Sequence, residues 1–147
     1  MSYKIFFLML VISFIIMYSV MFLNVDSIDH VYLSITRLYM AILMVAPMAL
    51  IMLLLMGKMY PNKKLNTVIA SASVIVFITT FIFLRNQTFI SDTQYMKAMI
   101  PHHSSAILPS KHASIQDPEV KRLSEEIIKS QEEEIEQMEQ ILNRMKK

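Results

Sequence analysis

The sequence predicts an all-α membrane protein in which three transmembrane helices precede an antiparallel helical hairpin. Hydrophobic residues make up 54% of the 147 residues and glycine occurs once, a composition unlike that of a soluble domain. Uncharged apolar runs cover residues 5–23, 38–57 and 65–84, whereas the last third of the chain is polar and amphipathic. We therefore expect a membrane domain over residues 1–85 and a helical hairpin domain over residues 86–147.

Each apolar run has the length of a membrane span. The runs hold 19 or 20 residues, and a helix of about 20 residues crosses the hydrocarbon core of a bilayer. The first run follows Lys4 as a signal peptide would, but it is too long and ends without a small-x-small cleavage site. We expect it to remain as an anchor.

The distribution of lysine predicts the orientation. The second loop, residues 58–64, carries three lysines, and Lys4 precedes the first span. The first loop instead carries Asp26, Asp29 and His30. Because basic loops stay in the cytoplasm, we expect a cytoplasmic N-terminus and a C-terminal domain in the periplasm or the extracellular space.

Methionine, which occurs 14 times, recurs at every fourth position of the second span, at Met40, Met44, Met48, Met52 and Met56. Residues four apart lie on nearly the same face of a helix. Such a stripe could pass a soft cation through the bilayer, or it could fill gaps between helices. We favour packing, because no charged or polar residue interrupts the stripe.

The polar third predicts two helices. Ser91 offers a cap for a helix that extends to about residue 110 or 112, with Pro101 and Pro109 expected to bend or break it. A second helix of about eight turns starts at Asp117, with apolar residues at a 3.6-residue period. The short connection, residues 113–117, makes the pair an antiparallel hairpin. A hairpin buries one seam only, so it should pack on the membrane helices or pair with a second copy into a four-helix bundle.

Chemically distinctive side chains fall on the facing surfaces of the two helices. At 100° per residue, Met96, Met99 and His103 face the seam and His102 lies at its edge. On the second helix, Gln131 and Glu134 fall within the apolar face beside Met138. Counting back from a turn near Ile115 puts Met99 level with Gln131, Met96 level with Glu134, and His103 opposite Ile127.

Two interpretations fit these positions. Thioethers with imidazole are the ligands that a soft or borderline metal such as copper prefers. Alternatively, His103, Gln131 and Glu134 form a hydrogen-bonded core network, since buried polar groups need partners. We expect His30 and His112 to be solvated.

Other functions find little support in the sequence. The chain has no cysteine, and Ser104 and Ser105 lack a base–acid constellation, so we expect no enzyme. A net charge of +2 with scattered basic residues does not indicate a nucleic-acid partner.

The C-terminal sequence resembles a known family. The stretch Tyr95-Met-Lys-Ala-Met-Ile-Pro-His-His-Ser-Ser-Ala-Ile, then Asp117-Pro-Glu-Val-Lys-Arg-Leu and the second-helix positions above, is similar to the bacterial domain-of-unknown-function 305 family over residues 88–145. The three spans look like its membrane-anchored subgroup. The resemblance implies a ferritin-like bundle that binds copper outside the cytoplasm, in the bacterial inner membrane. Its pattern falls on Met99, His102, His103, Gln131, Glu134 and Met138.

The leading hypothesis is therefore a membrane-anchored protein of copper tolerance that binds a copper ion through Met96 and these six residues. One alternative is a copper transporter component that uses the methionine stripe, and another is a metal-free structural or assembly module. The expected partners are the lipid bilayer, further copies of the chain and copper-handling proteins.

Overall fold

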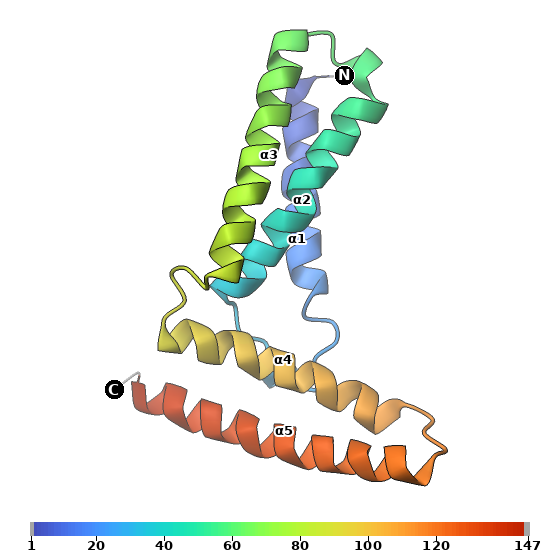
Figure 1. Ribbon diagram of the computed structural model, residues 1–147, viewed down its shortest axis with the longest axis vertical. Coiled ribbons are helices and arrows are strands. Elements are labelled where there is room, and N and C mark those ends of the chain that lie inside the picture. Colours follow the sequence, from blue (N-terminus) through green and yellow to red (C-terminus); the bar gives the residue numbers. More distant parts are fainter. Residues whose placement is uncertain (1, 146–147) are drawn as a thin grey trace. The chain divides into compact units, whose positions relative to one another are not determined.

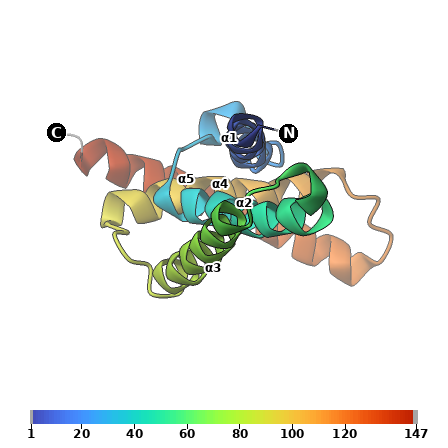
Figure 2. The same cartoon turned by 90° about the horizontal axis from the view of Figure 1, so that it is seen from above.

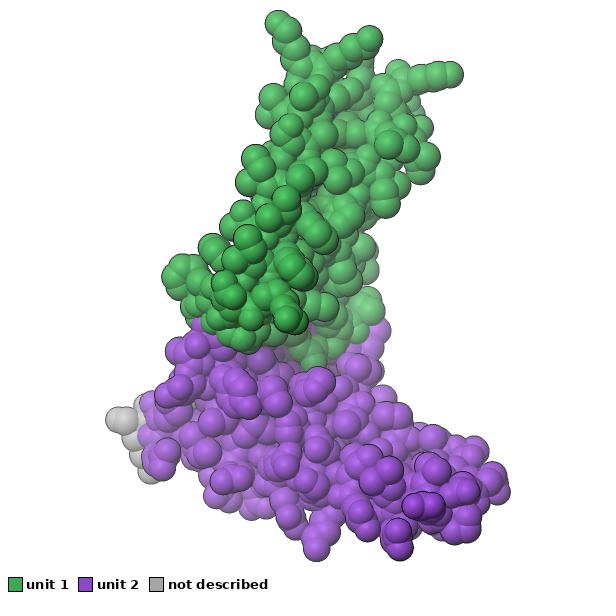
Figure 3. Space-filling model, viewed as in Figure 1, with its two compact units in different colours: residues 1–21, 36–89 green, residues 22–35, 90–147 purple. Residues whose placement is uncertain are grey.

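The computed structural model describes residues 2–145 and is helical (Figure 1). These residues contain the α-helices α1 (Tyr3–Val20), α2 (Ile35–Leu55), α3 (Lys63–Arg85), α4 (Asp92–His112) and α5 (Pro118–Met145), and the 3-10 helices η1 (Ile28–His30) and η2 (Gly57–Met59). The predicted all-α class is confirmed. Two compact units, coloured in Figure 3, comprise the described parts of residues 1–21 with 36–89 and of residues 22–35 with 90–147.

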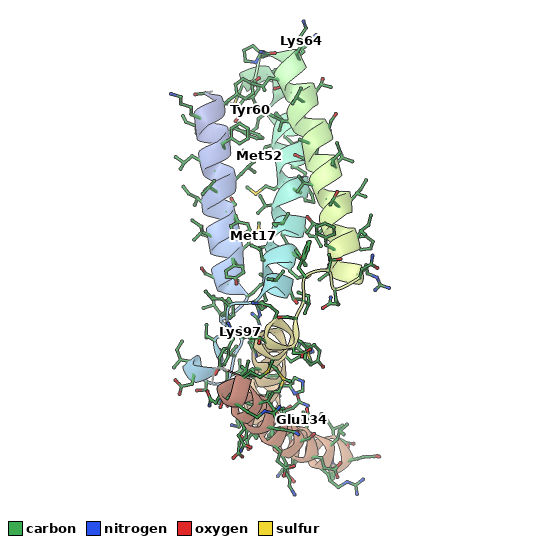
Figure 4. All side chains as sticks on the ribbon, turned by 90° about the vertical axis from the view of Figure 1, so that its left-hand side faces the viewer. Met17, Met52, Tyr60, Lys64, Lys97 and Glu134 are labelled. Carbon is green, nitrogen blue, oxygen red and sulfur yellow. The ribbon has the colours of Figure 1, made fainter. Side chains whose placement is uncertain are left out.

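The first unit consists of α1, α2 and α3. All three helices are long and apolar enough to cross a membrane, and their bounds lie within a few residues of the predicted spans. Figures 2 and 4 show α2 between the other two helices. Pro47 lies inside α2, which extends through it.

The core of the first unit is apolar. The buried side chains Phe6, Ala49, Met52, Tyr60 and Ile69 form one cluster that joins all three helices. Most other large apolar side chains of these helices are exposed. Both ends of the unit are tied by polar contacts, since Tyr3 donates to Asn66 Oδ1 at 2.8 Å and Tyr39 donates to the carbonyl of Thr88 at 2.8 Å.

The second unit contains the predicted hairpin. Helices α4 and α5 pack along each other in antiparallel directions (Figure 1). Both predicted caps are present, because Ser91 Oγ accepts from the backbone N–H of Gln94, and Asp117 Oδ1 accepts from those of Glu119 and Val120.

The expected break at the prolines is absent from α4. The helix is continuous from Asp92 to His112 with Pro101 and Pro109 inside it. Two serines supply extra bonds nearby, because the Ser105 and Ser110 hydroxyls donate to carbonyl oxygens one turn earlier, at 2.6 and 2.9 Å. Pro101 is also fully buried, so packing of the helix holds it in place.

The first interhelical loop differs most from the expected organisation. The predicted boundary at residue 85 assigned this loop to the membrane domain, whereas residues 22–35 belong to the same unit as the hairpin. Its helix η1 packs on α4. The hairpin therefore has a third packing element, which comes from the loop between α1 and α2.

Candidate metal site

The centre of the candidate site is a contact between the two hairpin helices. His103 Nδ1 of α4 lies 2.8 Å from Glu134 Oε2 of α5. The His103 side chain is 14% exposed and that of Glu134 is 47% exposed, so the contact sits at the margin of the seam. Glu134 also accepts from the Ser130 hydroxyl at 3.2 Å. Figure 4 marks Glu134 on α5.

This contact corrects the predicted register. His103 was expected opposite Ile127, but it meets Glu134, which lies two turns further along α5. Counting residues from the turn ignored that Cα–Cβ bonds tilt toward the N-terminus of each helix. The His103 side chain therefore points away from the turn, and the Glu134 side chain points toward it. As a result, two residues can meet although one is more residues away from the turn than the other.

The methionines gather along the same seam. The core of the second unit contains Met138, which is 9% exposed, and Met96 and Met99 pack against it half-buried. The remaining buried members of this cluster are Ile100, Ile107, Ile135 and Leu142. The structure thus brings the three predicted thioethers into one cluster.

The other two predicted residues are His102, at the edge of the seam, and Gln131, on α5. His102 is exposed, and its ring lies edge-on to that of His103 at 6.1 Å between centroids. Gln131 is half-buried on α5. His102 therefore holds the edge position that the helical wheel predicted.

The chemistry of His103 leaves room for a ligand. Its Nδ1 is buried and makes no hydrogen bond among residues 2–145, although Glu134 Oε2 lies 2.8 Å away. Within the same residues, no three His, Asp or Glu side chains are grouped closely enough to hold a metal ion. A metal at His103 and Glu134 would accordingly need methionine or Gln131 as further ligands.

The interhelical loop contributes polar contacts that sequence reasoning missed. Ser104 is fully buried, and its Oγ accepts from the backbone N–H of Asp26 at 2.8 Å and lies 2.8 Å from His30 Nδ1. His30, expected to be solvated, is thus half-buried against α4. A signal existed, since Ser104 occupies the same face as Ile100 and Ile107 at spacings of four and three residues. His112 is exposed, as expected.

Charged and phenolic groups hold the same loop to both helices. Lys111 Nζ lies 2.9 Å from Asp26 Oδ2 and 3.0 Å from Glu132 Oε1, and these two hydrogen bonds raise the pKa of the lysine. Tyr32 donates to Glu139 Oε1 at 3.2 Å. Burial, and then the charge of Glu139, raise the pKa of the Tyr32 phenol.

A hollow of about 280 Å³ lies beside this loop. It is lined by His30, Glu132, Ile135, Glu136 and Glu139. All three carboxylates of this lining already have partners, because Glu132 pairs with Lys111, Glu136 accepts from Gln140, and Glu139 accepts from Tyr32. The hollow is therefore a part of the loop–hairpin interface.

Comparisons with known proteins find one match to the hairpin and another that covers nearly the whole chain. The family model described as domain of unknown function DUF305 matches residues 85–147. The uncharacterized protein L153 of Acanthamoeba polyphaga mimivirus is 37% identical over 142 residues, which cover 95% of this chain and 91% of that relative. No solved structure matches the chain. The likeness to the relative thus includes the three apolar helices as well as the hairpin, and the chain belongs to the DUF305 family.

Proposed function

We propose that this chain is a membrane-anchored copper-binding protein whose hairpin holds the ion outside the cytoplasm. The observation that carries the proposal is the pairing of His103 with Glu134 next to the cluster that contains Met96, Met99 and Met138. Donor atoms 2.8 Å apart are close enough to share one ion whose bonds to nitrogen and oxygen are about 2.0 to 2.2 Å. The softness of the ligand atoms then determines which metal ion binds most tightly.

The donor set suits both oxidation states of copper in different combinations. Cu(I) prefers the three thioethers with His103, whereas Cu(II) prefers imidazole with the oxygen ligands of Glu134 and Gln131. His102, at the exposed edge of the seam, would transfer the ion between the site and the solvent. These roles fit sequestration, delivery or sensing of copper in copper tolerance, and they require binding rather than catalysis. Ser104, the serine beside His103, is fully buried and has no access to a substrate.

The topology supports the location. Lys58, Lys63 and Lys64 precede or start α3, while the loop between α1 and α2 carries Asp26 and Asp29. Basic loops remain in the cytoplasm, so α3 would emerge on the other side with the hairpin, in the bacterial inner membrane. The loop of residues 22–35 lies in the same unit as the hairpin, which supports a common compartment for both.

The test is a copper titration of the full chain in detergent, because the loop of residues 22–35 belongs to the folded hairpin unit. His103→Ala and Met138→Leu should each lower the copper affinity of the hairpin site at least tenfold. Matched controls are His112→Ala and Met145→Leu, which change an exposed histidine and an exposed methionine of the same two helices. Copper binding that both test variants leave unchanged would remove the proposed site.

One observation favours the assembly module as a second candidate function. At the turn end of the hairpin, Val120 and Leu123 are 49% and 54% exposed, beside a hollow of about 220 Å³ that Ile115 and Ile127 help to line. A second copy of the chain could cover these apolar residues. Metal-free self-association that Leu123→Gln abolishes, measured by sedimentation in detergent, would support this candidate.

A further inference from the structure

The methionine stripe of α2 does not face one environment. Met40 and Met44 are 42% and 37% exposed, whereas Met52 is buried and Met48 and Met56 pack against the same core cluster. Four residues advance a helix by about 400°, so each step rotates the stripe by about 40°. The stripe therefore winds from the outer surface of the unit, near the start of α2, into its interior, near the end of α2.

A further methionine from another helix joins the inner part of the stripe. Met9 of α1 packs against the cluster that contains Met52 and Tyr60. Figure 4 shows the Met52 side chain extending from α2 toward α1, with Tyr60 near the same end of the unit. Four thioethers, from Met9, Met48, Met52 and Met56, thus pack against one cluster.

The same cluster contains a polar atom without a partner. Tyr60 is 1% exposed, and its hydroxyl has no hydrogen-bond partner among residues 2–145. Its ring is held by Tyr3 and Phe6, at 5.4 and 5.3 Å between centroids. Buried tyrosine hydroxyls usually find a partner, and an orphaned one in a native structure requires an explanation such as a bound ion or water.

We propose that Met9, Met48, Met52 and Met56, with the Tyr60 hydroxyl, form a binding site for a soft monovalent cation of the Cu(I) class. Neutral thioethers select Cu(I) over hard cations, which prefer oxygen ligands. The Tyr60 hydroxyl of the same cluster supplies a further lone pair. This site lies in the first unit and is separate from the hairpin residues.

Its position within the unit suits a charged occupant. The cluster is built from the first turns of α1, the last turns of α2, Tyr60 just after η2 and the first turns of α3. It therefore lies toward the end of the spans that carries the lysine-rich loop, and not at their middle. A cation near a helix end is less costly than one at the bilayer centre, so the site can load from the adjoining aqueous side.

The experiment uses Ag(I), which shares the ligand preference of Cu(I) and is not oxidised in air. The background is the full chain in detergent with His103→Ala, Met99→Leu and Met138→Leu, so that the hairpin site is removed first. This protein should bind one Ag(I), and Met48→Leu with Met52→Leu should lower the affinity at least tenfold. The matched control is Met40→Leu with Met44→Leu, which changes two exposed methionines of the same helix and should leave binding unchanged.

Tyr60→Phe provides a second readout if the double leucine variant does not fold. Without metal, this variant should unfold at a higher temperature than the background protein, because it removes a buried hydroxyl that has no partner. With Ag(I), its metal-dependent rise in unfolding temperature should be smaller. Absence of Ag(I) binding in the background protein, or equal binding by the Met48/Met52 and Met40/Met44 variants, would overturn the proposal and leave the hairpin titration intact. A Tyr60→Phe variant stabilised by Ag(I) as much as the background would overturn the role of the hydroxyl.

Discussion

The two units of this chain are stabilised by different kinds of interaction. The core of the first unit is made of apolar side chains, among them methionine, and the buried Tyr60 hydroxyl has no hydrogen-bond partner among residues 2–145. In the second unit, directional contacts fix the loop of residues 22–35 to the hairpin, and the fully buried Ser104 hydroxyl meets two groups of that loop. A buried polar contact therefore holds a loop against the helices of the second unit, whereas polar contacts in the first unit tie the ends of an apolar core.

The largest expected effect comes from removing the Ser104 hydroxyl. Ser104→Ala removes the hydroxyl with little change in side-chain volume, but it leaves the Asp26 N–H and the His30 nitrogen without this partner. Burying such unsatisfied groups costs about 1 to 3 kcal/mol each, so we expect the second unit to lose about 2 to 6 kcal/mol of stability. Thermal unfolding followed by circular dichroism measures the loss. The control is Ser105→Ala, which removes a hydroxyl bonded only within its own helix, and an equal loss in both variants would contradict the role of the loop contact.

A smaller effect, opposite in sign between the units, is expected from deleting one tyrosine hydroxyl in each. Tyr32→Phe removes the bond to Glu139 and should destabilise the second unit by about 1 kcal/mol. Tyr60→Phe removes a buried hydroxyl that has no hydrogen-bond partner among the described residues, so the metal-free protein should be stabilised. Chemical denaturation of both variants tests the contrast. Equal destabilisation by the two substitutions would remove the distinction between the units.

The smallest expected effect is a loss of loop contacts at high pH. The pKa of Tyr32 is raised above its ordinary value of 10.0, and that of Lys111 above 10.5. A raised pKa means that the folded form binds the proton more tightly, so both contributions are complete below about pH 10 and are lost as pH rises through the raised values. The unfolding temperature of the second unit should therefore fall as the pH rises above about 10. Tyr32→Phe with Lys111→Gln should flatten this dependence, and an equally steep fall in that variant would contradict the assignment.

Local sequence signals predicted the helices, but not how the second unit is assembled. The apolar runs identified the first three helices, and Ser91 and Asp117 identified the starts of the last two, because these features act within a few residues. The contacts of Asp26 and His30 with Ser104 join residues 74 or more positions apart, and no periodicity encodes such a pairing. The loop looked like an ordinary connection between spans for this reason.

The sequence predicted which residues face the seam between α4 and α5, but it did not predict the register of the two helices. Met96, Met99 and Met138 share one cluster and His103 faces α5, as the helical wheel indicated. The partner of His103 depends on how two side chains lean along antiparallel axes, which residue counting does not include. Glu134 therefore replaced Ile127 as the residue opposite His103.

The central claim is that the hairpin binds copper through His103 and its neighbouring thioethers. Its most direct test is elemental analysis of the full-length protein purified from copper-fed cells, beside the variant with His103→Ala and Met138→Leu. We predict that the natural chain retains one more copper ion per chain than this variant, with both proteins equally helical. A copper-free natural chain, or equal copper in the two proteins, would contradict the account.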